Sequence, residues 1–165
     1  IDRQEIKLLL VGPLEDGPKS LNTDTLQEIK ENKNIINVGY QSNVRGYLSI
    51  SHALILPSYR EGFPNVILQA GAMGLPIICS DVNGSEEVID LSNGVIVKKR
   101  DTRSLKKGIE YLIQNYPSFS SEYCRKKVIE NFSQESFYPL LIDFYKKVWL
   151  ASKNYNEFAS KEWRD

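Results

Sequence analysis

The residues best placed to do chemistry lie in one short segment, from Ser58 to Ala70. Pro64 predicts the start of a helix there, because the fixed backbone angle of proline suits the first helical turn. The main-chain N–H groups around Pro64 would lack partners within the helix, and the helix dipole adds positive charge to them. Such an N-terminus binds phosphate. We therefore predict an anion-binding loop, with the carboxylate of Glu61 before it and the amide of Gln69 farther along the helix. From spacing alone, an ordinary strand-to-helix loop remains the alternative.

The elements that position this loop are short apolar runs alternating with segments of helical pattern. Continuous apolar runs are typical of strands covered on both faces of a parallel sheet, and the alternation predicts right-handed βαβ units. We predict a doubly wound, Rossmann-like α/β sheet whose ligands lie beyond the carboxyl ends of the strands. The expected strands cover residues 6–11, 35–38, 53–56, 76–79 and 94–97. The expected helices cover residues 22–32, 44–51, 64–73, 84–91, 101–115, 118–131 and 133–152.

Length and composition indicate one globular domain, which we place at residues 1–153, with a polar tail over 154–165. Lys plus Arg and Asp plus Glu both number 21, so the zero net charge gives no case for nucleic acid. Cys79 and Cys124 are the only cysteines, and we expect free thiols rather than a disulfide framework or a zinc site. No apolar run could span a bilayer, and we expect a cytoplasmic protein. The chain starts without methionine, almost directly on a strand, as an excised part of a longer protein would.

Glu61-Gly62-Phe63 resembles the donor-binding signature of retaining glycosyltransferases of the GT-B fold, of the family 4 type. In that family a second Glu follows after seven intervening residues, and Gln69 stands there in this chain. The resemblance implies that Glu61 is catalytic and contacts the donor sugar, while Gln69 binds the ribose. Gln69 lacks the charge that strengthens hydrogen bonds to a carboxylate. The implied donor-binding residues are Gly62, Phe63, Pro64, Asn65, Val66, Gln69, Gly39, Tyr40, Gly84 and Ser85.

Two further segments resemble the same family. Residues 80–88 resemble its glycine-rich loop near the diphosphate, although Asn83 replaces one usual Gly and Glu86 a frequent Pro. The alternative there is a plain helix start with Ser85 as its cap. Residues 37–40 match the segment that meets the nucleobase, and a simple strand end with a glycine turn is the alternative.

The resemblance runs from Ile6 to about Trp149 and begins at the family's second strand. It implies the C-terminal half of a GT-B enzyme, truncated at its N-terminus. The missing parts are the first strand, a helix whose Arg and Lys neutralise the diphosphate, and the acceptor-binding N-terminal domain. We expect the fragment to be inactive. The full-length protein would transfer a sugar from a UDP- or GDP-sugar to a lipid-linked or saccharide acceptor with retention, in polysaccharide or glycolipid synthesis, without metal or cofactor.

Two other functions stay open from the sequence: a GT-B sugar-nucleotide epimerase, and a non-catalytic sugar-nucleotide-binding module in which Gln69 marks lost activity. His52 is the sole histidine and matches no catalytic position of the family. The basic clusters at residues 98–100 and 106–107 predict a solvated surface, with peripheral contact at the inner face of a membrane as the alternative.

Overall fold

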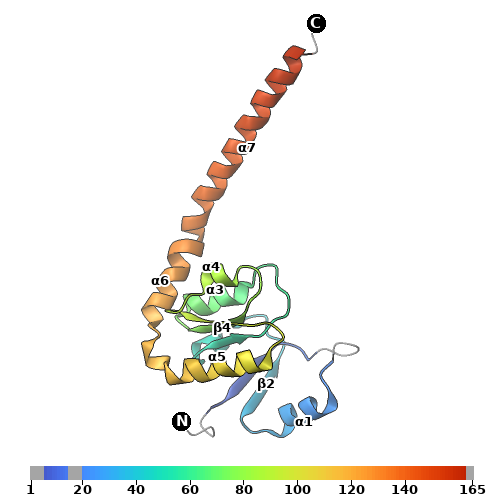
Figure 1. Ribbon diagram of the computed structural model, residues 1–165, viewed down its shortest axis with the longest axis vertical. Helices are drawn as coiled ribbons and strands as arrows, with labels where there is room; N and C mark the ends of the chain where they lie inside the picture. Colours follow the sequence, from blue (N-terminus) through green and yellow to red (C-terminus); the bar gives the residue numbers. More distant parts are fainter. Residues whose placement is uncertain (1–5, 15–19, 163–165) are drawn as a thin grey trace. The chain divides into compact units, whose positions relative to one another are not determined.

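The computed structural model describes residues 6–14 and 20–162, with side chains as far as residue 153. The chain divides into two compact units, Ile1–His52 and Ala53–Asp165 (Figure 1). The expected tail over 154–165 differs in part, because the last helix continues to Glu162. No residue between Ser152 and Glu162 is a glycine or proline, and polar composition alone does not end a helix. Residues 163–165 lie outside the described residues.

The first unit holds two parallel strands, with Leu8 opposite Ile35 in the ladder. Its elements are β1 (Leu8–Val11), α1 (Thr23–Glu31), β2 (Ile35–Gly39) and α2 (Arg45–Ser49). Asn22 caps α1, accepting a hydrogen bond from the Thr25 N–H at 2.8 Å. Gly39 ends β2 with a φ of 66°, and its carbonyl accepts from the Gly12 N–H at 2.8 Å.

The second unit holds three parallel strands in the order β3-β4-β5. Their bounds are β3 (Leu54–Leu56), β4 (Ile77–Ser80) and β5 (Gly94–Val97). All four residues of the central strand β4 are buried, as expected for an apolar run inside a parallel sheet. The predicted parallel α/β class is confirmed. Within the described residues the five strands pair as two separate ladders, because β1 pairs with β2 while β3 pairs with β4.

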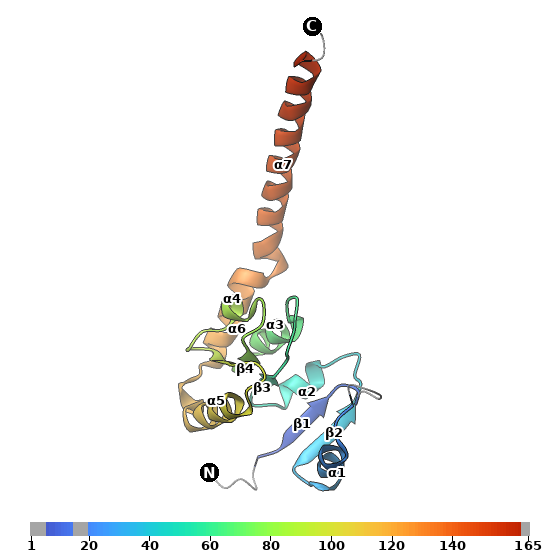
Figure 2. The same cartoon turned by 45° about the vertical axis from the view of Figure 1, so that its right-hand side comes forward.

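Helices cover both faces of the three-stranded sheet. Helix α5 (Thr102–Gln114) packs on one face, where Ile78, Val97 and Leu112 form a buried cluster. Neighbouring β4 residues such as Ile77 point to the opposite face. Helix α3 (Asn65–Ala72) lies on that side, and both views show β4 between α3 and α5 (Figures 1 and 2). This arrangement is the doubly wound order predicted from the sequence.

The ends of α3 are set by local backbone chemistry. Pro64 takes the N-cap position, so the prediction that it is the first helical residue is wrong by one position. At the other end Gly74 has a φ of 80° and terminates the helix, close to the predicted end at residue 73. The Leu75 N–H donates to the Ala70 carbonyl at 3.0 Å and the Gly74 N–H to the Gly71 carbonyl at 2.8 Å. These two bonds satisfy carbonyls that the helix end would otherwise leave without a partner.

Helix α6 (Ser121–Phe132) packs closely along α3. A Cβ atom on Gly71 of α3 would lie 2.5 Å from the Val128 side chain, so only glycine permits this approach. The Arg125 guanidinium donates to the Ala72 carbonyl at 2.5 Å and stabilises the carboxyl end of α3. The close packing fixes α3 between the sheet and α6, and with it the loop that precedes α3.

Three further elements complete the second unit: α4 (Ser85–Val88), a 3₁₀ turn (Tyr116–Ser118) and the 29-residue α7 (Gln134–Glu162). The part of α7 whose side chains are described exposes many large apolar residues. These are Phe137, Tyr138, Leu140, Ile142, Phe144, Tyr145, Val148, Trp149 and Leu150, each between 50% and 68% exposed. Among the described helices none is both long and apolar enough to cross a membrane.

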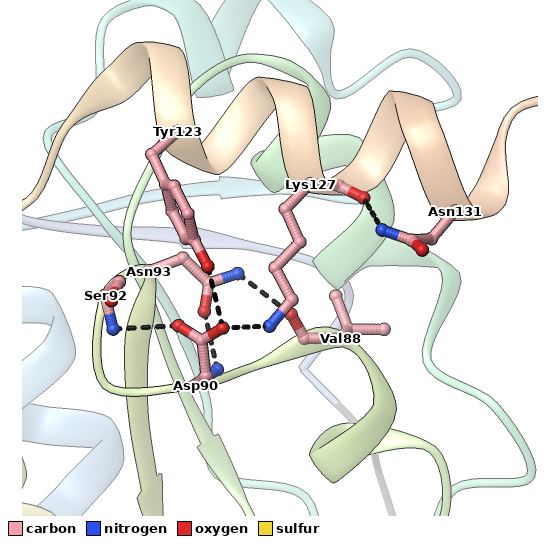
Figure 3. Close-up of polar contacts among 7 residues, drawn as sticks. All are labelled: Val88, Asp90, Ser92, Asn93, Tyr123, Lys127 and Asn131. Carbon is pink, nitrogen blue, oxygen red and sulfur yellow. Dashed lines mark hydrogen bonds and ion pairs between the residues drawn. The ribbon is translucent and has the colours of Figure 1, made fainter.

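A polar cluster ties the segment between α4 and β5 to α6 (Figure 3). The Asp90 carboxylate accepts hydrogen bonds from the Lys127 ammonium, from the Tyr123 hydroxyl at 3.0 Å and from the Ser92 N–H at 2.8 Å. The side chain of the fully buried Asn93 accepts a hydrogen bond from the Asp90 N–H at 2.7 Å, which fixes the turn between these two residues. Burial by itself would raise the pKa of Asp90, but these hydrogen bonds and the Lys127 charge hold it below its ordinary value of 3.8.

Replacing Lys127 with Met is expected to lower the free energy of unfolding by about 1 kcal/mol at neutral pH, because the Asp90 side chain is 41% exposed and water screens the pair. A lowered carboxyl pKa stabilises the fold above pH 3.8, and this contribution is lost as the pH falls through the folded-state pKa. Urea unfolding over a pH series should therefore show a difference between the two proteins that shrinks in acid. Lys126→Met, which removes only an exposed pair with Glu130, is the control. A difference that does not change with pH would contradict this assignment.

Candidate functional site

Glu61 lies in the loop between β3 and α3, at the carboxyl edge of the three-stranded sheet. Its side chain is half-buried and therefore still reaches solvent. Its negative charge acts on Cys79 near the end of β4, since burial first and then Glu61 raise the pKa of the Cys79 thiol to about 11. The carboxylate thus lies near the end of the central strand. This edge is where parallel α/β sheets bind ligands.

The N-terminus of α3 follows directly and has no side-chain cap. Helices α1, α5 and α6 all begin with a residue whose side chain accepts from a main-chain N–H: Asn22, Asp101 and Ser120. Pro64 cannot do this, and the first N–H groups of α3, on Asn65 and Val66, have no carbonyl one turn back within the helix. These donors and the dipole of α3 favour a negatively charged group at this end.

Phe63 holds the loop in place. A Cβ atom on Gly84 would lie 2.4 Å from the Phe63 ring, so the ring lies directly against the Gly84 backbone. The Phe132 ring of α6 packs on Phe63 with 6.1 Å between ring centroids. The structure therefore brings together two segments singled out in the sequence, the Glu61–Phe63 loop and the turn at Gly84. Gly84 itself has a φ of 79°, which favours glycine.

Ser85 does not play the part of a helix cap. Gly84 occupies the N-cap position of α4, and Ser85 is fully buried. The Ser85 hydroxyl donates to the Val82 carbonyl at 2.7 Å, and its N–H donates to the same oxygen at 3.1 Å. The alternative of Ser85 as a helix cap is therefore wrong, because a buried hydroxyl takes the nearest acceptor within its own turn. Both donors of Ser85 are therefore engaged with the Val82 carbonyl.

The other predicted site residues of the second unit differ in how exposed they are to solvent. Gly62, Asn65 and Gln69 are exposed, whereas Pro64 is buried and Val66 is half-buried. Asn65 and Gln69 are four residues apart, so they share one exposed stripe of α3. In the first unit Gly39 is half-buried at the end of β2, and Tyr40 is 74% exposed.

Sequence reasoning missed two contacts at the carboxyl edge of the sheet. The Arg100 guanidinium lies over the Tyr59 ring, 5.3 Å from its centroid, although Arg100 has a φ of 58°. The Asp81 carboxylate accepts from the Lys99 N–H at 2.7 Å. These contacts link the loops after β3, β4 and β5, and no local sequence signal announces them, because each joins residues far apart in the chain. Residues 98–100 remain exposed, and of the two contacts only that of Arg100 with Tyr59 is made by a cationic group.

Both cysteines are fully buried free thiols, as predicted. Burial and the nearby Glu61 charge keep the Cys79 thiol protonated at neutral pH by raising its pKa to about 11. Because the thiolate is the reactive form, we expect iodoacetamide to leave both cysteines unmodified in the folded protein and to modify both in urea. Mass spectrometry of the tryptic peptides checks this. Rapid labelling of Cys79 without denaturant would contradict the burial of this thiol.

Comparison with known proteins identifies relatives of this arrangement. The family model described as glycosyl transferases group 1 matches residues 1–115. The capsular polysaccharide biosynthesis glycosyltransferase CapM of Staphylococcus aureus is 28% identical over 143 residues, which is 85% of this chain and 37% of CapM. The N,N'-diacetylbacillosaminyl-diphospho-undecaprenol alpha-1,3-N-acetylgalactosaminyltransferase of Campylobacter jejuni is 26% identical over 136 residues, which is 81% of this chain and 33% of that protein. The chain thus spans about a third of the length of these relatives.

Among solved structures, the crystal structure of Anabaena Alr3699/HepE in complex with UDP matches with a TM-score of 0.75 at 15% identity. The match covers 86% of this chain and 41% of the HepE chain. At this identity the likeness concerns the fold, and it agrees with the GT-B architecture expected from the sequence.

Proposed function

Because this chain belongs to the family of group 1 glycosyl transferases, we propose that it is the donor-binding part of an enzyme that transfers a sugar from a nucleotide-sugar to an acceptor hydroxyl. The observation that carries the proposal is the α3 N-terminus without a side-chain cap, directly after the Glu61 carboxylate. Main-chain donors fixed before the reaction stabilise a leaving diphosphate without needing to reorganise. A carboxylate beside them can accept hydrogen bonds from sugar hydroxyls.

The roles within this site follow from the side chains that stay accessible. Glu61 positions the donor sugar, and the backbone of Gly62 and Phe63 contacts the sugar and its phosphate. Gln69, exposed one turn beyond Asn65, accepts from ribose hydroxyls. Transfer proceeds with retention of anomeric configuration in the manner of family 4, without a metal or cofactor. Gly39 and Tyr40 remain predictions from the resemblance to that family.

The substrates and partners are proposed by class. The HepE structure contains UDP, and this supports a UDP-sugar as donor. The Staphylococcus aureus relative is named for capsular polysaccharide biosynthesis, and the Campylobacter jejuni relative for a diphospho-undecaprenol substrate. We therefore propose a saccharide or lipid-linked acceptor, used in polysaccharide or glycolipid synthesis at the inner face of a membrane. An acceptor-binding domain in the full-length protein completes the enzyme.

Gly62→Ala tests the donor site without disturbing the fold. A Cβ atom at Gly62 meets no atom within 4 Å, so stability should not change. A methyl group on this loop would nevertheless crowd a bound donor, and we expect UDP-glucose or another accepted UDP-sugar to bind the full-length protein about tenfold more weakly. Isothermal titration calorimetry measures this effect. Gly46→Ala is the matched control, because it also meets no atom within 4 Å and lies in α2.

The same titration, followed by product analysis, separates the alternatives. Transfer to an acceptor with the α configuration kept supports the retaining transferase. Binding without turnover would instead favour a non-catalytic module, for which Gln69 in place of a Glu is the motivating departure. Isomerisation of the donor alone would identify an epimerase.

A further inference from the structure

The Phe63 ring contacts two segments of the second unit that come from elsewhere in the chain. It lies against the backbone of Gly84, and the Phe132 ring packs on it with 6.1 Å between ring centroids and 45° between ring planes. Phe63 lies two residues after Glu61 and directly before the N-cap of α3. The Phe63 side chain is 37% exposed, so packing does not enclose the ring and each of these contacts limits how far it can turn.

Phe132 can hold this ring because α6, which ends at Phe132, is itself fixed along its length. Near the start of α6, a Cβ atom on Gly74 would lie 2.1 Å from the Ser121 hydroxyl oxygen. In the second half of α6, a Cβ atom on Gly71 would lie 2.5 Å from the Val128 side chain. Both approaches bring α6 directly against α3 or its end. Helix α6 is therefore a rigid support for the ring at its last residue.

The same helix also fixes the segment that contains Gly84. Gly84 is the N-cap of α4, and Asp90 follows the end of α4 by two residues. The Lys127 ammonium of α6 donates to the Asp90 carboxylate (Figure 3). Both contacts of Phe63 thus lead back to α6, through Phe132 directly and through α4 and Asp90 on the Gly84 side.

We propose that Phe132 is a positioning residue for the donor site. It holds the Phe63 ring against Gly84 and thereby orients Glu61 and the first N–H groups of α3 for the nucleotide-sugar. This inference rests on the proposed function and adds a residue that touches no substrate. A loop that is ordered before binding avoids the entropic cost of being ordered by the ligand, so loss of the Phe132 ring weakens donor binding.

The test compares Phe132→Leu with a matched Phe→Leu control in the full-length protein. Phe119 is also half-buried, but it packs against the cluster around Ile78 beneath α5. We expect both substitutions to lower the melting temperature by about 3 °C. Only Phe132→Leu should raise the KM for a UDP-sugar, by about tenfold, while the KM for the acceptor stays within about twofold. The same donor KM in both variants would overturn the proposal.

A double variant shows whether Phe132 acts through Phe63. In a protein that already carries Phe63→Leu, the ring that Phe132 supports is absent. Adding Phe132→Leu should then change the KM for the UDP-sugar by less than about twofold, because the two substitutions remove the same contact. A further tenfold increase would mean that Phe132 acts without Phe63, which contradicts the proposed role.

A measurement without any sugar nucleotide separates this role from the proposed function. Arg60 is exposed and directly precedes Glu61, so trypsin can cut there once the loop over residues 61–63 opens. We expect cleavage after Arg60 to be about tenfold faster in Phe132→Leu and unchanged in Phe119→Leu, as quantified by mass spectrometry of early digests. Unchanged cleavage in Phe132→Leu would overturn the positioning role. Faster cleavage in a protein that binds no UDP-sugar would support the positioning of the loop and refute the proposed function alone.

Discussion

Glu61→Gln is expected to lower the rate constant for sugar transfer by the full-length protein by about 100-fold or more. The substitution keeps the size of the side chain and one acceptor oxygen but removes the negative charge beside the α3 N-terminus. Charge-assisted hydrogen bonds are roughly twice as strong as neutral ones, so donor hydroxyls would be held less firmly during transfer. Stability should change little, because the Glu61 side chain is only half-buried.

Steady-state kinetics with a saturating UDP-sugar measures the loss, and urea unfolding verifies the fold. Glu110→Gln is the control, since Glu110 forms an exposed ion pair with Lys106 on α5, 3.9 Å apart. Such surface pairs contribute less than about 1 kcal/mol, and this variant should retain the original rate. A Glu61→Gln protein that transfers sugar at the original rate would remove Glu61 from the proposed mechanism.

Gly84→Ala is expected to lower the free energy of unfolding by about 2–4 kcal/mol, for two separate reasons. The φ of 79° at Gly84 is unfavourable for any residue with a Cβ atom. The new methyl group would also lie 2.4 Å from the Phe63 ring, which cannot retreat freely because Phe132 packs against it. The ring and the loop over residues 61–63 would have to shift, so we also expect weaker binding of a UDP-sugar.

Urea unfolding measures the loss, and Gly62→Ala, which meets no atom within 4 Å, is the comparison in the neighbouring loop. The double variant Gly84→Ala with Phe63→Leu separates the two reasons. A smaller side chain at residue 63 relieves the overlap but leaves the backbone strain, so the two substitutions should be non-additive. Strict additivity would show that Phe63 does not restrict Gly84.

Some helix boundaries could be predicted from single residues because the forces there are local. Asn22 and Asp101 cap helices through hydrogen bonds to N–H groups two or three residues away. Gly74 ends α3 because its left-handed backbone angles suit glycine. Composition does not predict the end of α7, because no glycine or proline lies between Ser152 and Glu162 and polar residues alone do not end a helix.

In the candidate site, too, some features could be predicted from the sequence and others only from the structure. Residue types and spacing were sufficient to single out Glu61, the loop after it and the start of α3, because these features lie within one short segment. The structure added that Gly84 and Phe132 hold Phe63 on two sides. It also showed that the Ser85 hydroxyl is buried and donates to the Val82 carbonyl, a contact that depends on the three-dimensional surroundings of the residue.

The sequence by itself determined the α/β class, the strands' apolar runs and the position of the loop before α3, since all three depend on neighbouring residues. Only the tertiary structure decided that the described strands pair as two ladders, that Asp90 binds Lys127 across 37 positions, and that the large apolar side chains of α7 between residues 137 and 150 are exposed. Contacts between segments that are distant in the chain depend on how the elements pack, and local residue patterns do not specify this packing.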